Sequence, residues 1–145
     1  MTNRGKLIAI DGIDGCGKET QAKRLVGKLN NAGHGTEFMS FPRYFTPTGR
    51  IVGGPYLGKP EIMDSFFPEG AANVPAEAAS LYYVADRIYA LPEMRKIIDS
   101  GKNLVLDRYV QANMIHQGGK IRDKSERERY YDDLNFVEHK FGKLP

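Results

Sequence analysis

Short apolar runs along the chain predict the strands of a sheet. Leu7 to Ile10 is apolar throughout, and Asn103 to Asp107 contains the fully apolar Leu104-Val-Leu106. Continuous apolar runs of this length are typical of parallel strands that are buried on both faces. Thr36 to Phe41 predicts a further strand, which Pro42 ends.

Helical spacing of apolar residues predicts the elements between these strands. The segment from Gln21 to Leu29 places four apolar side chains on one face, namely Ala22, Leu25, Val26 and Leu29. Pro75 fits the first position of a helix that runs to about Ala90. Pro92 is expected to begin a second helical piece that Gly101 closes.

The helix from 75 to 90 presents two kinds of face. One stripe is expected to face the core and consists of Leu81, Val84, Ala85 and Ile88. A different face carries Ser80, Tyr83 and Arg87. Because each of these side chains carries a polar group, this second face is expected to lie outside the core.

Further helices are predicted towards the end of the chain. Tyr109 to Gln117 has helical character and stops at the pair Gly118-Gly119. Ser125 with Glu128 predicts a capping box for a last helix. The apolar stripe expected on that helix consists of Tyr130, Leu134, Val137 and Phe141.

The order of elements predicts the fold class. Strand, loop, helix, strand, helix, strand and helix in succession indicate an α/β protein with a parallel sheet and right-handed helical crossovers. A short helix around Gly49 to Leu57 fits this order, whereas Gly58 to Pro75 has no clear period and predicts a long loop. The last helix should feed a further strand, so the sheet is expected to be incomplete at its C-terminal side. Residues 1–145 are expected to form a single domain.

A glycine-rich loop, Gly12 to Thr20, lies between the first strand and the first helix and reads Gly-Ile-Asp-Gly-Cys-Gly-Lys-Glu-Thr. This context is typical of a phosphate-binding loop. Its glycines allow backbone N–H groups to close around phosphate oxygens, and the helix N-terminus adds partial positive charge. Lys18 is expected to reach the β- and γ-phosphates of a bound nucleotide. The alternative is a glycine-rich turn without a ligand.

The position after the lysine departs from the usual pattern of such loops. A Ser or Thr normally stands there and helps to hold Mg²⁺, but here it is Glu19, and a hydroxyl appears only at Thr20. Thr20 is therefore the candidate metal ligand. The residues expected to bind ATP in this loop are Gly12, Gly15, Cys16, Gly17, Lys18, Glu19 and Thr20.

Asp107-Arg108-Tyr109 is the second chemical signal. An apolar strand that ends in Asp107 would place a carboxylate beside the phosphate loop, where it can orient Mg²⁺ or its waters. Arg108 could neutralise a transferring phosphoryl group. The expected catalytic residues are thus Lys18, Asp107 and Arg108, whereas the alternative is a surface ion pair after a strand.

Composition and charge bound the environment and the partners. The 145 residues are 41% hydrophobic and 27% charged, as in a globular protein, and the net charge of +3 is small. The basic residues are scattered, so a nucleic-acid partner is not expected. One cysteine fits a reducing cytoplasm. No signal peptide and no apolar run of membrane-spanning length are present in the sequence, which predicts a cytoplasmic protein without a membrane partner.

Four motifs in matching order resemble those of the thymidylate kinase family, within the nucleoside monophosphate kinases. The phosphate-binding loop is followed by Phe41-Pro-Arg-Tyr44, which resembles the family's acceptor-phosphate segment. Leu81-Tyr-Tyr-Val-Ala-Asp-Arg87 resembles its base-binding helix, and residues 107 to 118 resemble its Asp-Arg-Tyr helix. The resemblance covers Leu7 to Pro145 and implies a three-layer α/β/α P-loop NTPase fold.

The resemblance assigns substrate-binding roles residue by residue. Asp14 would accept from the acceptor sugar's 3′-hydroxyl. Tyr83 would stack on thymine, and Arg87, one helical turn on, would donate to the base's O4. Asn113 and Gln117 would read the base edge. Solvated side chains on an exposed helix face are the alternative for the tyrosine and the arginine.

The acceptor phosphate is assigned in the same way to a group of residues after two strands, namely Phe41, Arg43, Tyr44 and Arg108. A proline turn with a solvated arginine is the alternative for the first three. His116 stands where many members have a Tyr against the sugar 2′ position, which leaves discrimination against ribonucleotides open. Gly15 stands where one subgroup carries a catalytic arginine, and the other subgroup takes that arginine from a lid.

The activity implied by the resemblance is transfer of the γ-phosphoryl group of ATP to thymidylate, with Mg²⁺. The acceptor phosphate is already anionic, so the enzyme mainly positions its substrates and neutralises charge. The lid and the adenine-binding loop would lie beyond Pro145, and the chain is expected to be the N-terminal portion of such a kinase. A kinase for another nucleoside monophosphate and a catalytically silent nucleotide-binding fragment are the alternatives. A homodimer, common in the family, is also compatible with the resemblance.

Overall fold

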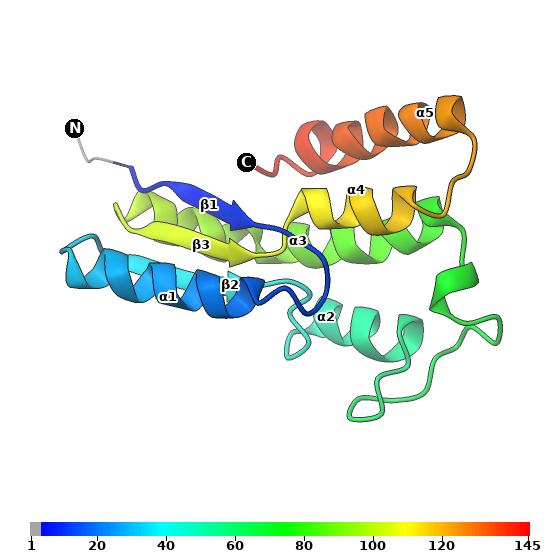
Figure 1. Ribbon diagram of the computed structural model, residues 1–145, viewed down its shortest axis with the longest axis horizontal. Helices are drawn as coiled ribbons and strands as arrows, with labels where there is room; N and C mark the ends of the chain where they lie inside the picture. The colour runs from blue at the N-terminus through cyan, green and yellow to red at the C-terminus, as the bar shows by residue number, and fades with distance from the viewer. Residues whose placement is uncertain (1–3) are drawn as a thin grey trace. The chain divides into compact units, whose positions relative to one another are not determined.

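The computed structural model describes residues 4–145, and a three-stranded parallel sheet lies at its centre. The strands are β1 (Leu7–Ile10), β2 (Thr36–Ser40) and β3 (Asn103–Asp107), in the order β1-β3-β2 (Figure 1). Ile10 and Ser40 are both the register partners of Asp107. The carboxyl ends of all three strands therefore meet at one edge of the sheet, which is where ligands bind in open α/β sheets.

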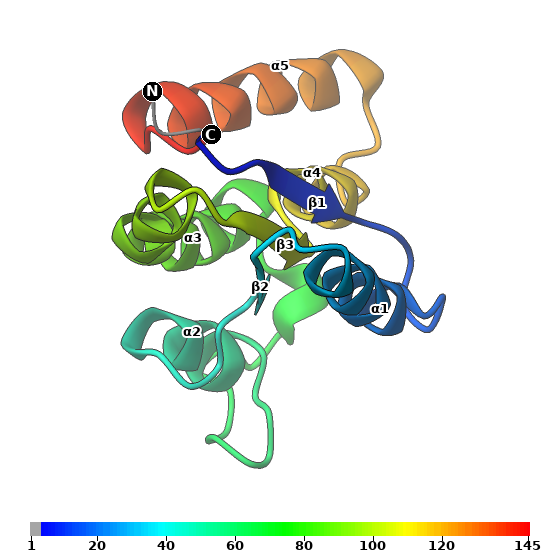
Figure 2. The same cartoon turned by 90° about the vertical axis from the view of Figure 1, so that its left-hand side faces the viewer.

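Helices cover both faces of this sheet. α1 (Lys18–Asn31) and the C-terminal half of α3 (Ala76–Asp99) lie on opposite sides of the strands (Figure 2). Leu104, Val105 and Leu106 of β3 are completely buried, as a strand covered on both faces requires. The expected α/β class with a parallel sheet between helical layers is confirmed.

The chain divides into two compact units, which are described separately below. The first unit comprises the chain up to Phe41 together with Ala90–Ala112, and the second comprises Pro42–Tyr89 and Asn113–Pro145. The elements of the second unit that have not yet been named are α2 (Pro47–Ile51), a π-helical turn (Val52–Tyr56), a 3₁₀ turn (Ala71–Asn73), α4 (Val110–Gly118, from Asn113 on), α5 (Lys124–Asn135) and a π-helical turn (Phe136–Phe141).

The core of the second unit has two clusters of buried residues. The first consists of Val52, Tyr56, Val74 and Ala79, and Tyr83 packs against it. The second consists of Ala76, Val84, Tyr130 and Leu134. α3 contributes to both clusters, so this helix is buried on more than one side.

The expected stripe of α3 was therefore partly wrong. Leu81 is 56% exposed and Ala85 is exposed, whereas Ser80 and Arg87, which were expected outside the core, are each only 2% exposed. The polar face is buried because its polar atoms find partners inside the protein, which removes the penalty for burying them.

Pro92 does not divide this helix as expected. α3 continues through Pro92 to Asp99. A proline in a helix interior costs about 3 kcal/mol, since it removes one backbone hydrogen bond and crowds the preceding turn. Leu91 and Met94 are buried on either side of Pro92 and hold the helix together by packing.

The last helical segment also differs from its expected pattern. Its N-cap is Asp123, whose carboxylate accepts from the Glu126 N–H at 2.9 Å, and not Ser125. Phe141 is 72% exposed although it was expected in the apolar stripe, whereas Glu138 is completely buried. The wider turn of the π-helix at Phe136–Phe141 changes which side chains face the core, so the stripe expected for a regular α-helix does not continue through it.

The long segment from Gly58 to Pro75 is anchored by one lysine. The Lys120 ammonium donates to the Ala71 carbonyl at 2.9 Å and to the Val74 carbonyl at 3.0 Å. Burial lowers the pKa of Lys120 below its ordinary value. The segment thus has a defined path although it has no regular period.

The buried hydroxyl pair of Tyr130 and Ser80 gives a prediction on alkaline stability. Ser80 Oγ donates to the Ala76 carbonyl, so the Tyr130 hydroxyl, 2.6 Å away, donates to Ser80. Burial raises the pKa of Tyr130 from 10.0 to about 12. The neutral tyrosine therefore stabilises the fold fully below pH 10, and this contribution is lost as the pH rises through about 12.

We expect the free energy of unfolding to fall less between about pH 9 and about pH 11 in Tyr130→Phe than in the unsubstituted chain. Urea titrations at both pH values measure the difference, and Tyr131→Phe on the same helix is the control. An equal fall in Tyr130→Phe would contradict the assignment of this pH dependence to Tyr130.

Among residues 4–145, no helix combines the length and apolar character needed to cross a membrane.

Candidate functional site

In the first unit, the glycine-rich loop connects the end of β1 to the start of α1. Gly15 has a φ of 77° and Gly17, the N-cap of α1, has a φ of 82°. Both values lie in the left-handed region that favours glycine. The loop therefore turns sharply into the helix, and the first N–H groups of α1 point out of its N-terminus.

Lys18 folds back over this loop. Its side chain is almost completely buried, and Nζ donates to the Ile13 carbonyl at 2.9 Å. The same nitrogen lies 3.6 Å from Oδ1 of Asp14. A cation fixed at a helix N-terminus provides the positive charge that a polyphosphate requires.

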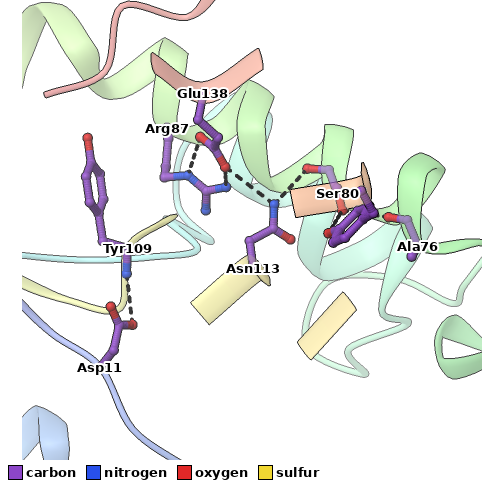
Figure 3. Close-up of polar contacts among 8 residues, drawn as sticks. Asp11, Ala76, Ser80, Arg87, Tyr109, Asn113 and Glu138 are labelled. Atoms are coloured by element: carbon purple, nitrogen blue, oxygen red, sulfur yellow. Dashed lines mark hydrogen bonds and ion pairs between the residues drawn. The ribbon is translucent and has the colours of Figure 1, made fainter. Parts of the chain in front are cut away.

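Asp107 and Arg108 stand beside the loop, as the sequence predicted. The Arg108 guanidinium forms an ion pair with Asp14. Asp107 Oδ2 accepts from the Ser40 hydroxyl at 3.0 Å, whereas its Oδ1 is buried and has no hydrogen-bond partner among residues 4–145. Asp11, at the end of β1, accepts from the Tyr109 N–H at 3.1 Å and ties β1 to the Asp-Arg-Tyr segment (Figure 3).

The chemistry of Asp107 fits a bound Mg²⁺ or its coordinated water. Its unpartnered carboxylate oxygen is the hard donor that Mg²⁺ prefers. In the described part of the chain, no group of three or more His, Cys, Asp or Glu residues could hold a metal by itself. Mg²⁺ is commonly held by one or two carboxylates together with substrate phosphates.

The remaining loop residues are more exposed. Lys23, one turn along α1, holds the Glu19 carboxylate at 2.6 Å and lowers its pKa below the ordinary value. Glu19 is thus directed along the helix surface, and Thr20 offers the hydroxyl of the first turn. Cys16 is exposed, and a Cβ on Gly12 would lie 2.9 Å from its Sγ.

Phe41, the last of the expected site residues in the first unit, is nearly fully buried. Its ring packs against that of Tyr109 with 6.2 Å between the centroids. Its side chain therefore belongs to the core beside the Asp-Arg-Tyr segment.

In the second unit, Asp86 organises the segment that contains Arg43 and Tyr44. Its carboxylate is 1% exposed and accepts from the Arg43 N–H at 2.8 Å and from the Thr48 hydroxyl at 2.9 Å. Arg43 is buried, and its guanidinium lies 5.3 Å from the centroid of the Phe45 ring. Asp86 thus fixes the backbone of the proposed acceptor-phosphate segment to α3.

Gly49 permits the close approach on which this segment depends. A Cβ at Gly49 would lie 1.7 Å from the Arg43 carbonyl oxygen, so Gly49→Ala must displace the backbone. We expect this substitution to lower the free energy of unfolding by about 2 kcal/mol or more. Gly27→Ala is the matched control, because no atom lies within 4 Å of its Cβ, and it should raise stability by about 0.5 to 1 kcal/mol.

Denaturant unfolding of both variants measures these changes. If Gly49→Ala unfolds at the same urea concentration as the unsubstituted chain, the close packing of Arg43 against Gly49 is wrong.

Arg87 and Asn113 belong to a buried polar cluster of the second unit (Figure 3). The Arg87 guanidinium forms a two-pronged ion pair with Glu138, in which Nε donates to Oε2 at 3.0 Å. Asn113 Nδ2 donates to the Ser80 carbonyl at 3.3 Å and lies 3.5 Å from Glu138 Oε1. The cluster thus links α3, α4 and the C-terminal turn.

Two oxygens of this region are buried without a partner in the described part of the chain. They are Oδ1 of Asn113 and Oε1 of Gln117, which lies one helical turn further along α4. Buried polar atoms are normally hydrogen-bonded, so these two oxygens are candidate acceptors for a ligand or a water.

Three further residues expected to bind the substrate are more exposed than Arg87 and Asn113: Tyr83 for the base, Tyr44 for the phosphate and His116 for the sugar. Tyr83 is half-buried, with its ring edge-on to Tyr56 at 5.8 Å between centroids. Tyr44 is also half-buried, and Lys59 Nζ lies 4.6 Å from the centroid of its ring. His116 is exposed.

The sequence analysis did not identify Asp86 and Glu138 as residues that support the candidate site. Asp86 adjoins Arg87 in the Ala-Asp-Arg motif, so its place on the motif was a usable signal. Glu138 is 51 residues from Arg87, and nothing local identifies its partner. A lone carboxylate next to Leu134 and Val137 was the available hint, since an acidic residue on an apolar stripe is buried only when it is paired.

Comparison with known proteins bears on the function of these residues. The family model described as thymidylate kinase matches residues 10–127. A thymidylate kinase of Homo sapiens is 32% identical over 117 residues, which cover 81% of this chain and 50% of that protein. A thymidylate kinase of Brachyspira hyodysenteriae is 34% identical over 122 residues, which cover 83% of this chain and 53% of that protein. The chain spans about half the length of the curated relatives that it matches.

A solved structure gives the same result. The thymidylate kinase of Candida albicans, described as having broad substrate specificity, superimposes with a TM-score of 0.68 at 25% identity. The match covers 92% of this chain and 56% of that one. Since the family model alone covers most of the sequence, the chain belongs to the thymidylate kinase family.

Proposed function

We propose that this chain binds thymidylate and ATP as part of a kinase that transfers the γ-phosphoryl group of ATP to the thymidylate phosphate. Membership of the thymidylate kinase family supports this activity. The observation that carries the choice of acceptor is the buried cluster of the second unit, where Arg87 offers N–H donors and Asn113 Oδ1 lacks a partner. A pyrimidine base that carries a carbonyl oxygen next to a ring N–H fits these two side chains, because Arg87 can donate to the oxygen and Asn113 Oδ1 can accept from the N–H.

On the donor side, Lys18 and the backbone of the glycine-rich loop would bind the phosphates of ATP. Lys18 is already held over the loop by the Ile13 carbonyl, so little side-chain freedom remains to be lost on binding. Arg108 would stabilise the transferring group. Arg108 would then leave its ion pair with Asp14 and bind a phosphoryl oxygen. Asp14 would accept a hydrogen bond from the 3′-hydroxyl of the acceptor sugar.

Mg²⁺ would be held through Asp107, with Thr20 as the hydroxyl ligand, and would supply neutralisation of the phosphate charge. The unpartnered Oδ1 of Asp107 supports this assignment. Proton abstraction is not demanding here, because the acceptor phosphate is already anionic and phosphoryl transfer depends mainly on positioning and charge.

On the acceptor side, Arg43 and Tyr44 would bind the thymidylate phosphate, and the anchoring of Arg43 by Asp86 supports this role. Tyr83 would stack on the base, and Gln117 would read its edge. His116 would lie near the sugar.

A homodimer in the cytoplasm is the proposed setting of this activity. In the second unit, Ile51 and Leu81 are 45% and 56% exposed and line one cavity of about 450 Å³ together with Ala78 and Ala85. Such an apolar face on α2 and α3 fits a second copy of the chain. Light scattering after gel filtration would measure the mass, and a monomer at all concentrations would contradict the dimer.

Transfer of phosphate from ATP to nucleoside monophosphates tests the activity directly. We propose that residues 1–145 form one nucleotide-binding domain. The chain would be incubated with Mg·ATP and one acceptor, either thymidylate, deoxycytidylate or AMP, and the products would be separated by ion exchange. Formation of thymidine diphosphate above the other products is the expected result. Binding of both nucleotides without turnover would favour a catalytically silent fragment, and preference for AMP would favour a different nucleotide kinase.

A further inference from the structure

The completely buried Glu138 is not among the residues assigned to substrate binding. It lies in the C-terminal π-helical turn of the second unit, where a carboxylate is costly to bury without partners. Both of its oxygens are engaged by Arg87, and one of them also faces Asn113 Nδ2 at 3.5 Å. Glu138 therefore contacts the two side chains that the proposed function places on the base.

The ion pair fixes the direction of the Arg87 guanidinium. Nε and Nη2 are turned towards Glu138, which leaves the Nη1 end of the fork pointing away from it (Figure 3). A guanidinium has five N–H donors, so the donors on that end remain for a ligand. What Arg87 presents to a base is accordingly a donor that can only meet an acceptor.

The same carboxylate fixes the orientation of the Asn113 amide. Its two polar neighbours on one side are the Ser80 carbonyl and Glu138 Oε1, and both are acceptors only. The amide NH₂ must face them, and Oδ1 must face the other way (Figure 3). Oδ1 is buried there without a partner in the described part of the chain, so it presents an acceptor that can only meet an N–H.

These two orientations distinguish one kind of pyrimidine edge from another. Thymine and uracil carry an N–H beside a carbonyl oxygen, which complements an acceptor from Asn113 and a donor from Arg87. Cytosine carries a bare ring nitrogen beside an amino group, so its edge would meet like groups at both positions. A site with fixed hydrogen-bonding groups rejects the wrong edge because those groups are left unpaired.

We infer that Glu138 is a positioning residue for base selection, which sets the site to accept an imide edge and to reject an amino-pyrimidine edge by orienting Arg87 and Asn113. This inference rests on the proposed function, since it assigns the base to these two side chains. It adds a residue that does not touch the base itself.

The test compares deoxyuridylate with deoxycytidylate, which differ only at this edge of the base. Calorimetric titration would give the affinity ratio for the unsubstituted chain, for Glu138→Gln and for Glu138→Asp. Glu128→Gln is the matched control, because it is the same change on α5 at an exposed position. Circular dichroism would first establish that each variant is folded.

Glu138→Gln replaces one carboxylate oxygen by an NH₂ group, so Arg87 loses one of its two acceptors and the Asn113 amide is held by the Ser80 carbonyl alone. Glu138→Asp keeps the charge, but its side chain is too short to reach both partners. We expect the unsubstituted chain and Glu128→Gln to prefer deoxyuridylate by about 20-fold or more, and both Glu138 variants to prefer it by less than about 3-fold.

A folded Glu138 variant that keeps the full preference would overturn the inference while leaving the proposed function intact. Failure of both variants to fold would also overturn it, because Glu138 would then serve the fold and not base selection. If the unsubstituted chain binds neither thymidylate nor deoxyuridylate, the proposed function itself fails, and the inference fails with it.

Discussion

Replacing Lys18 by methionine is expected to lower the affinity of the chain for Mg·ATP by about 100-fold, or about 3 kcal/mol. The ammonium group lies over the glycine-rich loop, where it is almost completely buried and bonded to the Ile13 carbonyl. Methionine keeps much of the side-chain volume, so the loop should keep its shape while it loses the charge that binds phosphate. Calorimetric titration with Mg·ATP measures the change.

Lys28→Met is the control for this substitution, because Lys28 is an exposed lysine in the last turn of the same helix. It removes the same charge from the chain but not from the loop. Equal affinities for ATP in Lys18→Met and in the unsubstituted chain would show that the loop does not bind phosphate through this lysine.

The buried pair of Arg87 and Glu138 should produce the largest effect on stability. Arg87→Met or Glu138→Met alone leaves an unpaired buried charge, and each is expected to lower the free energy of unfolding by about 3 to 5 kcal/mol. The double variant should lose much less than the sum, because two apolar side chains can replace a buried ion pair at little cost.

Urea unfolding of the four chains gives the coupling energy between the two residues. The exposed pair of Lys102 and Glu37, with 2.8 Å between its charged atoms, is the comparison. Lys102→Met should cost less than about 1 kcal/mol. Losses that simply add in the Arg87 and Glu138 variants would contradict the direct pairing of these two groups.

Local pattern was enough to predict the frame of the first unit. β1 and β3 have the ends that their apolar runs predicted. β3 is the central strand, and its three apolar residues are completely buried, as expected of a strand covered on both faces. β1 lies at an edge of the sheet and is only half-buried, with Ala9 exposed, so the expected burial of this strand on both faces was wrong. The glycine-rich loop was also predictable. Gly15 and Gly17 adopt backbone angles that favour glycine, so the requirement is written into the sequence at the position where it acts.

The second unit was predicted less well because its polar residues depend on distant partners. Arg87 was expected on an exposed face, since helical spacing alone treats an arginine as a surface residue. Glu138 makes its burial possible from 51 residues away. Leu81 was expected in the core for the opposite reason, although nothing in the second unit covers it sufficiently to bury it.

The candidate site residues also divide into those whose positions could be predicted from the sequence and those whose contacts could not. Asp14, Lys18 and Arg108 lie close together because they follow the ends of two paired strands. The anchoring of Arg43 by Asp86 was not predictable, since a backbone N–H leaves no trace in the sequence. Such contacts follow from the fold and not from the motif.

Titration of the chain with thymidylate and then with AMP, in buffer containing Mg²⁺, tests the central claim most directly. Binding does not require turnover, so it examines the base site proposed at Arg87 and Asn113 by itself. We predict that thymidylate binds at least about 10-fold more tightly than AMP, and that Asn113→Ala weakens thymidylate binding by about 10-fold. Tighter binding of AMP, or no binding of thymidylate to the folded chain, would contradict the assignment of this site to thymidylate.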